Sequence, residues 1–161
     1  MSKGDNMRKW IILIMTIFIM SGCATKYKSV GFSGGYSETR LGSNIFNVSF
    51  RGNGYTSRER ATDFTLLRSA ELCLQNGFKY FIITNSEKHT DLYTTPKSYD
   101  TSGTINGSSF DATTTQSGGI TFRKPSINNT VVCFTKKPKM NGLIYDANFI
   151  TKSIKTKYEI K

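Results

Sequence analysis

The chain alternates between short apolar segments and longer polar stretches. Phe46, Val48 and Phe50 are separated by single polar residues, which is the two-residue period of a half-buried strand. Residues 80–83 and 131–134 are continuous apolar runs, and such runs are typical of strands buried on both faces. Each of these segments is predicted to be a core strand.

A helix is predicted between the first and the second of these strands. Thr56 and Glu59 have the spacing of a capping box, so the helix should begin near Ser57. Asn76 and Gly77 supply a left-handed stop at its C-terminus. The residues of its apolar face recur at helical spacing: Leu67, Ala70 and Leu74.

Residues 86–119 are rich in Thr, Ser, Gly and Asn and poor in apolar residues. The segment is long for a structureless loop in a small domain, so it is either a mobile insertion or a long polar hairpin that returns through residues 120–122. A second helix is predicted over residues 145–154, where apolar residues again have helical spacing. The predicted fold is a small α+β two-layer sandwich in the order β-α-β-β-β-α, with a helical layer on one sheet.

The start of the chain has the organisation of a signal peptide. Residues 7–9 are Met-Arg-Lys and form a positive segment, so translation is expected to start at Met1 or at Met7. An apolar run of eleven residues follows, and this is well short of the ~20 residues that a spanning helix needs. Two small residues then precede Cys23, which predicts cleavage at that point.

Residues 20–23, Met-Ser-Gly-Cys, resemble the bacterial lipobox, with Met where Leu is usual. The resemblance implies a diacylglyceryl thioether on Cys23, cleavage before it and an acyl chain on the new amino terminus. Three acyl chains hold a protein on a membrane for good. Ala24 follows where lipoproteins of the inner membrane usually carry Asp, which implies the periplasmic face of the outer membrane. The alternative is a secretory peptide followed by an unmodified cysteine.

The predicted organisation has four parts. Residues 1–22 are the signal peptide, and residues 23–44 form a lipidated tether. Residues 45–155 form a single α+β domain, which contains the polar insertion 86–119. Residues 156–161 form a basic tail.

The chain is strongly basic, with a net charge of +11. Removal of residues 1–22 takes away three basic residues and one acidic residue, which leaves 19 basic and 10 acidic residues, or +9. Nucleic acid is not the expected partner, because the chain is exported and carries no nucleic-acid-binding motif. The anionic partners outside the cytoplasm are lipid phosphates and acidic proteins. Seven lysines in residues 136–161 are interpreted either as a solvated tail or as part of such a contact.

Several strings of the chain resemble one protein family. They are GGYSET at 34–39, RGNGYTSRER at 51–60, LLRSAEL at 66–72 and Tyr-Asp-Ala at 145–147. The family comprises small Gram-negative envelope lipoproteins of uncharacterised role, so the resemblance implies an envelope location and brings no catalytic or binding residues. The layout is also similar to small lipoproteins that act as envelope sensors or secretion-machine components.

The segment between the first strand and the first helix is the candidate interaction or anion site. Amides at a helix N-terminus attract anions, and arginines stand close by in the sequence. The segment lacks the third Gly of a dinucleotide fingerprint and the Gly-Lys-Ser/Thr of a nucleotide loop. If the segment does not bind an anion, it is either a tight turn or a docking surface of Tyr and Arg side chains. The candidate residues are Arg51, Gly52, Asn53, Gly54, Tyr55, Arg58 and Arg60.

Acylation of Cys23 leaves Cys73 and Cys133. The oxidising periplasm permits a disulfide between them. The bridge would close a loop of about sixty residues and stabilise the fold by roughly 4 kcal/mol. The alternative is a pair of buried thiols that act as small apolar residues.

The sequence shows no catalytic constellation. His89 is the only histidine and lies in polar sequence, so no triad and no metal-ligand set is indicated. We therefore expect a non-enzymatic protein without a metal and without a cofactor other than the covalent lipid. The leading hypothesis is an accessory component of an outer-membrane assembly that binds an envelope protein partner. The alternative is a module that binds an anionic envelope ligand such as lipid, lipopolysaccharide or glycan phosphate.

The lipobox leads to a direct prediction. Cys23→Ser should abolish metabolic palmitate labelling, because the thioether that starts acylation cannot form. The variant should remain as uncleaved precursor or be released in soluble form. Palmitate labelling that persists in this variant would show that Cys23 is not the acylated residue.

Overall fold

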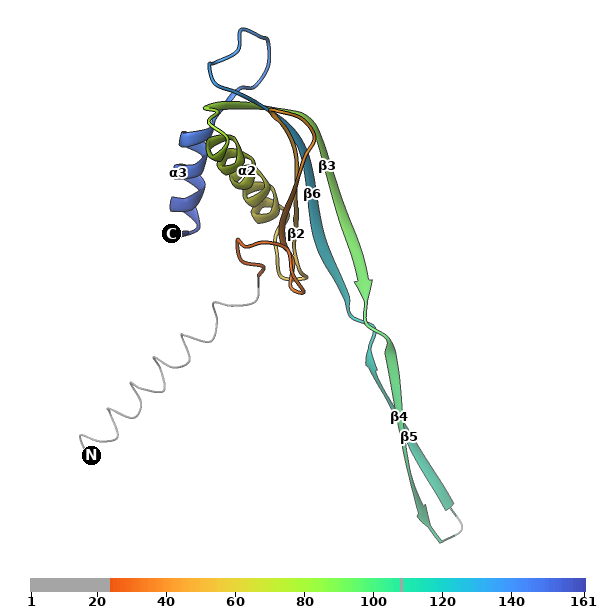
Figure 1. Ribbon diagram of the computed structural model, residues 1–161. Coiled ribbons are helices and arrows are strands. Elements are labelled where there is room, and N and C mark those ends of the chain that lie inside the picture. Colours follow the sequence, from red (N-terminus) through yellow and green to blue (C-terminus); the bar gives the residue numbers. More distant parts are fainter. Residues whose placement is uncertain (1–23, 108) are drawn as a thin grey trace, which may run out of the picture.

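In a computed structural model of the protein, residues 24–107 and 109–161 are described, so the predicted signal peptide and Cys23 lie outside the described residues. The described residues form a five-stranded sheet, a two-stranded ribbon that extends from it, and two helices on one face of the sheet (Figure 1). The elements in chain order are β1 Gly35–Arg40, β2 Ile45–Arg51, α2 Arg58–Gln75, β3 Tyr80–Thr94, β4 Lys97–Asn106, β5 Ser109–Gly118, β6 Thr121–Phe134, β7 Tyr145–Asp146 and α3 Ala147–Lys157.

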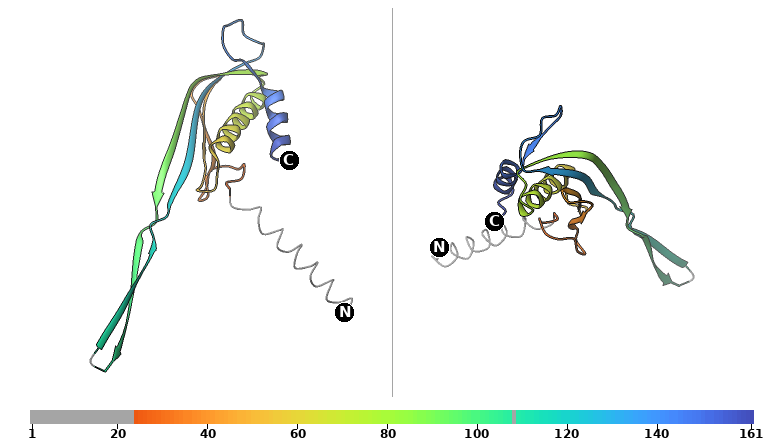
Figure 2. Two further views of the ribbon diagram at one scale, coloured as in Figure 1. Left: turned by 180° about the vertical axis from the view of Figure 1, so that it is seen from behind. Right: turned by 45° about the horizontal axis from the view of Figure 1, so that its top comes forward.

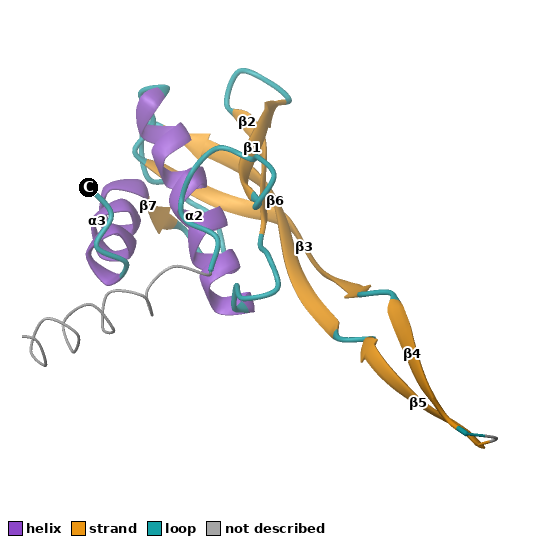
Figure 3. Cartoon of the chain, turned by 90° about the horizontal axis from the view of Figure 1, so that it is seen from below, coloured by secondary structure: helices purple, strands orange, loops and turns teal. Residues whose placement is uncertain are grey.

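The sheet has the strand order β1-β2-β6-β3-β7, and every neighbouring pair is antiparallel. Because β2 and β3 both run opposite to β6, they are parallel to each other and are separated by it. The helices lie together on one face of the sheet (Figure 3). The predicted α+β class, with a helical layer on one sheet, is therefore confirmed, and the structure adds β1 and the strands of the extension.

The prediction that residues 80–83 and 131–134 are buried on both faces is wrong. Phe81, Val131 and Cys133 are fully buried, whereas Ile82 and Val132 between them are only half-buried. The reason is that helices cover one face of the sheet, and the described residues include no layer on the other face. The apolar runs are thus half-buried strands with apolar residues on their outer face.

Residues 121–122 of the predicted return strand and the predicted strand 131–134 are parts of one continuous strand, β6, and Ile120 precedes it. Every second residue of β6 is buried from Pro125 onward, including the polar Asn129. The amide oxygen of Asn129 accepts a hydrogen bond of 2.8 Å from the Ser86 hydroxyl, which satisfies it in the buried position. The polar residues therefore continue the strand and do not interrupt it.

Residues 86–119 adopt the second of the two predicted alternatives, a long hairpin. β3 continues with β6 to the pair Thr94 and Thr121, and β4 then pairs with β5 in an antiparallel ribbon. We call this ribbon, residues 97–106 and 109–118, the arm. It projects away from the sheet and from both helices (Figure 2).

The joint between the arm and the sheet consists of the four residues between the strands, 95, 96, 119 and 120, together with Gly118 at the end of β5. The Thr95 N–H donates to the Ile120 carbonyl at 3.0 Å, and the Ile120 N–H donates to the Thr95 hydroxyl at 3.0 Å. Gly118 has a φ of 88°, and a Cβ there would collide with the carbonyl oxygen of Pro96. The joint, which also includes Gly119, thus needs glycine where the ribbon changes direction.

Helix α2 begins as predicted after Ser57, but Ser57 and not Thr56 is the N-cap. The Ser57 hydroxyl accepts a hydrogen bond of 3.1 Å from the Arg60 N–H. Thr56 is instead 6% exposed, and its hydroxyl takes part in a loop network described below. The predicted capping box is therefore wrong, because the N-cap is Ser57 and the third helical residue is Arg60 and not a Glu or Gln.

The C-terminal stop of α2 is confirmed. Gly77 has a φ of 81°, and its N–H donates to the Leu74 carbonyl at 3.0 Å. The Phe78 N–H donates to the Cys73 carbonyl at 2.8 Å, which completes a Schellman motif. Phe78 also packs on the core below the helix end.

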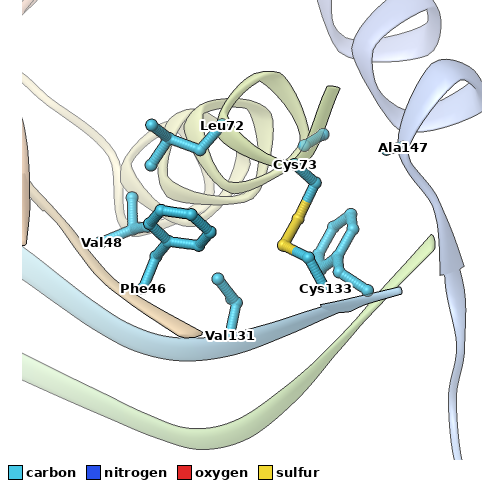
Figure 4. Close-up of a cluster of buried hydrophobic side chains, with 9 residues drawn as sticks. Phe46, Val48, Leu72, Cys73, Val131, Cys133 and Ala147 are labelled. Atoms are coloured by element: carbon cyan, nitrogen blue, oxygen red, sulfur yellow. A yellow bond between two sulfur atoms is a disulfide. The ribbon is translucent and has the colours of Figure 1, made fainter. Parts of the chain in front are cut away.

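The main core lies between α2 and the sheet and contains a disulfide between Cys73 and Cys133 (Figure 4). The two Cα atoms are 5.7 Å apart, and both residues are fully buried. The bridge therefore joins α2 directly to β6, and the disulfide alternative is the one observed. The buried residues of this cluster are Phe46, Val48, Ala70, Leu72, Cys73, Phe81, Val131, Cys133 and Ala147.

A second, aromatic cluster forms around Phe64 of α2. Its ring lies 5.2 Å from Phe50, 5.4 Å from Tyr27 and 4.9 Å from Tyr158, measured between ring centroids. Tyr27 belongs to the predicted tether and Tyr158 to the predicted basic tail. The structure differs from both predictions, because residues 24–44 contain β1 and pack on the domain, and the C-terminal residues close the same core.

The disulfide sets the expected stability. Replacement of both Cys73 and Cys133 by Ala should lower the free energy of unfolding by about 4 kcal/mol, because the bridge restricts a loop of 60 residues in the unfolded chain. Urea denaturation under non-reducing conditions measures the change. The wild-type protein unfolded with a reductant should match the double variant. Equal stability of the oxidised wild type and the variant would contradict the structural role of the bridge.

Candidate functional site

The segment at residues 51–60 is tied into the domain by a network of short side chains. The Thr56 hydroxyl accepts a hydrogen bond of 3.0 Å from the Thr25 N–H and donates one of 2.9 Å to the Asn53 side chain. The Thr25 hydroxyl donates to the Ser33 carbonyl at 2.8 Å and accepts from the Asn53 N–H at 2.9 Å. The start of the described chain is thus fastened to the loop that precedes α2.

Gly52 and Gly54 serve close packing on β6. A Cβ on Gly52 would lie 2.7 Å from the Cβ of Thr56, and one on Gly54 would lie 2.9 Å from the ring of Phe122. The Gly52 N–H donates to the Pro125 carbonyl at 2.8 Å. These contacts explain the glycines without a bound phosphate.

The loop amides are already used inside the protein. The N–H groups of Gly52, Asn53, Tyr55 and Thr56 donate to carbonyl or side-chain oxygens of the loop and its neighbours at 2.8–3.1 Å. A phosphate-binding loop presents such groups to its ligand. The loop therefore does not have the geometry of a preformed anion site.

The three arginines of the candidate site point to different parts of the surface. The Arg60 guanidinium lies over the rings of Phe64 and Tyr158, at 5.7 and 5.1 Å from their centroids. Arg58 donates to the Thr90 hydroxyl at 3.1 Å. Arg51 lines a separate pocket of about 210 Å³. The structure does not bring the three guanidinium groups together.

The pocket beside Arg51 has mixed charge. It lies where β2 ends next to β6, and its charged lining residues are Arg51, Lys124 and Asp91. Phe32 from the N-terminal segment also lines it. Tyr55, the remaining candidate, is 65% exposed, and its ring lies 6.4 Å from that of Phe122.

An ion-pair network that the sequence did not indicate links α2 to β1 and α3. Arg68 pairs with Glu38 at 2.6 Å and with Glu71 at 3.4 Å, and Lys155 pairs with Glu71 at 3.2 Å. The Tyr27 hydroxyl donates to the Glu71 carboxylate. Burial and this hydrogen bond raise the pKa of Tyr27 well above its ordinary value.

Part of the basic C-terminal segment is also paired. The Lys157 ammonium lies 2.5 Å from the Glu59 carboxylate and 2.8 Å from that of Asp63. The Tyr158 hydroxyl donates to Asp63 at 2.8 Å. Burial, with this hydrogen bond, raises the pKa of Tyr158. These residues hold α3 against the first turns of α2, so the segment is more than a solvated tail.

The described residues contain no group of three or more His, Cys, Asp or Glu placed to hold a metal ion. The His89 side chain is 68% exposed, and its Nε2 lies 3.7 Å from the Glu87 carboxylate. Within residues 24–107 and 109–161, no helix has the length and apolar character to cross a membrane.

The arm is a candidate interaction surface that the sequence reasoning missed. On one face the apolar and aromatic residues project to solvent, with Tyr99 61%, Ile105 75% and Phe110 67% exposed. The opposite face carries only polar side chains of similar size: Ser98, Asp100, Ser102, Thr104, Ser109, Asp111, Thr113, Thr115 and Ser117. The two-residue alternation was the available signal, but it is weak among so many Ser and Thr residues.

Comparisons with known proteins add no relative: no family model, no curated protein and no solved structure matches the chain. The resemblance to envelope lipoproteins therefore stays a prediction from the sequence.

The raised pKa of Tyr27 leads to a prediction for alkaline pH. The folded state keeps Tyr27 protonated, whereas the unfolded chain releases the proton near the ordinary value of 10.0, so stability should fall as the pH rises above 10. In Tyr27→Phe this part of the loss should disappear. The stability advantage of the wild type, constant from pH 7 to about pH 9, should then shrink above pH 10.

Urea denaturation across this pH range measures the difference. Tyr99→Phe is the matched control, because its hydroxyl lies on the arm and outside this network. An advantage of the wild type over Tyr27→Phe that stays constant to pH 11 would show that burial and the Glu71 hydrogen bond do not raise the pKa of Tyr27.

Proposed function

We propose that the protein is a lipid-anchored lipoprotein on the periplasmic face of the outer membrane, and that it acts without catalysis as an interaction component of an envelope assembly, such as secretion or envelope-sensing machinery. The observation that carries the proposal is the arm. A two-stranded ribbon on its own is at best marginally stable in water. Within the described chain, nothing packs on either face of the arm.

Both edges of the arm offer backbone groups for further pairing. Among the described residues, β4 pairs only with β5, so the outer edge of each strand is open along ten residues. Such edges bind an added strand through main-chain hydrogen bonds. A chain that keeps an edge of this length exposed is suited to bind a partner by strand addition.

The anchor and the domain fit together at short range. The Thr25 N–H is bonded to the Thr56 hydroxyl, so only Ala24 separates the folded domain from Cys23. One extended residue spans about 3.5 Å. A lipid on Cys23 would hold the domain directly at the membrane surface, without the tether that the sequence suggested.

The function can be tested with a variant that lacks the arm. Residues 95–120 are replaced by Asn-Gly, a two-residue hairpin turn that joins the paired residues Thr94 and Thr121. The variant should fold with nearly unchanged thermal stability, because the arm contributes nothing to either core cluster. Formaldehyde crosslinking in intact cells should give a discrete adduct with the wild type and none with the variant.

Two results would contradict the proposal. The same adduct in both proteins would place the interaction on the domain and not on the arm. The absence of any adduct with the wild type, although it travels with outer-membrane porins on a sucrose gradient, would argue against an interaction component. Arg51→Glu is the control for surface charge, since Arg51 lies outside the arm and is exposed.

A further inference from the structure

The arm has the dimensions of a membrane-spanning ribbon. β4 and β5 have 10 residues each. A tilted strand needs about 9–11 residues to cross the hydrocarbon core of a bilayer. In strands that cross membranes, apolar residues facing lipid alternate with polar residues facing inward. In the arm the opposite face is polar throughout, whereas the face assigned to lipid is apolar mainly in the half near the tip, where Ile105 pairs with Phe110 and Gly103 with Ala112, and Tyr99 lies nearer the joint. We call this second face the apolar face.

The apolar face also carries the polar side chains of Thr101, Thr114, Gln116 and Lys97, and the last two lie in the half of the arm next to the joint. The hydroxyls of Thr101 and Thr114 are hydrogen-bonded to each other across the strands at 2.9 Å. The ring of Phe110 covers Gly103, since a Cβ there would lie 2.5 Å from the ring. Lys97 is the first residue of β4, next to the joint, where a headgroup region would lie.

The arm and the predicted anchor leave the domain at the same end. β2 stops at Arg51 opposite Ser126, and only β3 and β6 continue beyond this pair. Thr25 is bonded to the loop that follows β2, so the start of the described chain lies at this end as well. The views in Figures 1 and 2 show the arm extending past the N-terminal segment 24–34.

We infer that the arm enters the lipid bilayer to which the chain is anchored, and that the arms of several copies pair edge to edge there. The apolar faces contact acyl chains, and the polar faces of Ser, Thr and Asp line a shared interior. The inference rests on the anchor of the proposed function and names the partner as further copies of this chain.

The arm could enter lipid only if its open edges pair with those of other copies. A bilayer offers no water to bond the open edges of β4 and β5, and each unbonded backbone group there costs several kcal/mol. Because the two edges have equal length, β4 of one copy can pair with β5 of the next along the whole strand. Further copies would add in the same way until every β4 and β5 edge is paired.

Fluorescence in vesicles tests the insertion. The full-length acylated protein is reconstituted into vesicles of phosphatidylethanolamine and phosphatidylglycerol, and single cysteines carry an environment-sensitive dye. Cys73 and Cys133 are bridged and do not react. A label at Ile105 should shift to the blue and be quenched from within the lipid. A label at the neighbouring Thr104 should be quenched by aqueous iodide only.

A label at Phe149 is the control, because this residue is 70% exposed on α3, far from the arm. It should respond to iodide alone. Iodide quenching at both Ile105 and Thr104, without a blue shift, would overturn the inference that the arm enters lipid.

A matched pair of substitutions tests the two faces. Ala112 and Thr113 are adjacent on β5, both exposed, and face opposite sides near the middle of the arm. Ala112→Arg should reduce the equilibrium constant for insertion about thirtyfold or more, because a cation facing lipid at mid-depth costs ~2–4 kcal/mol. Thr113→Arg should insert like the wild type. Equal insertion of the two variants would contradict the assigned faces.

Crosslinking tests the pairing between copies. Vesicles receive a mixture of one variant with Ser102→Cys on β4 and another with Thr113→Cys on β5, and a short bifunctional thiol reagent is added. The mixture should give more inter-copy product than either variant alone, because β4 lies beside β5 of the next copy. An arm that is labelled by lipid but gives no inter-copy product would refute the pairing.

The outcomes separate this inference from the proposed function. Mass spectrometry of Cys23 reports the anchor independently of the dye. If the arm stays in water but crosslinks in cells to a different protein, the proposed function stands and the inference fails. If Cys23 is not acylated, the anchor fails, and vesicles with added unanchored protein still decide whether the arm inserts.

Discussion

Strands β3 and β6 pair antiparallel from the core of the domain to the base of the arm, and this pairing places most of the other elements. Within the domain, β6 lies between β2 and β3, so it joins the N-terminal hairpin to the rest of the sheet. The disulfide fixes α2 to the end of β6 that lies farthest from the arm. At its other end, β6 leads into the joint. One strand therefore connects the most buried part of the molecule with the most exposed part.

The sequence predicted the elements that neighbouring residues encode. The end of α2 follows from Gly77, because a left-handed conformation costs glycine little, and the strand at residues 46–50 follows from its alternation. The disulfide remained one of two alternatives. A choice required knowing that Cys73 on α2 faces Cys133 on β6, and this depends on how the helix is rotated on the sheet.

Other features depend on contacts between distant residues, which no local pattern encodes. Tyr27 and Tyr158 stand alone among lysines and polar residues, yet both pack on Phe64. The arginines of the candidate site show that residues close in sequence can also lie apart in the structure. Arg58 and Arg60 are two residues apart, and on a helix that spacing turns side chains by about 200°, so closeness in sequence puts them on different faces. The two faces of the arm could not be predicted from the sequence, because Ser and Thr occur on both faces of a ribbon and obscure the alternation.

The joint between sheet and arm has a mechanical consequence. A ribbon of ten residues measures about 33 Å, so a change of one degree in the direction of its base moves its tip by about 0.6 Å. The backbone angles at Pro96, Gly118 and Gly119 therefore set the direction of the whole arm, and small changes in them move its tip over a large distance. The hydrogen bonds between Thr95 and Ile120 restrict these angles. A side chain at Gly118 would collide with the Pro96 carbonyl oxygen and would therefore move the tip, although Gly118 lies at the other end of the arm.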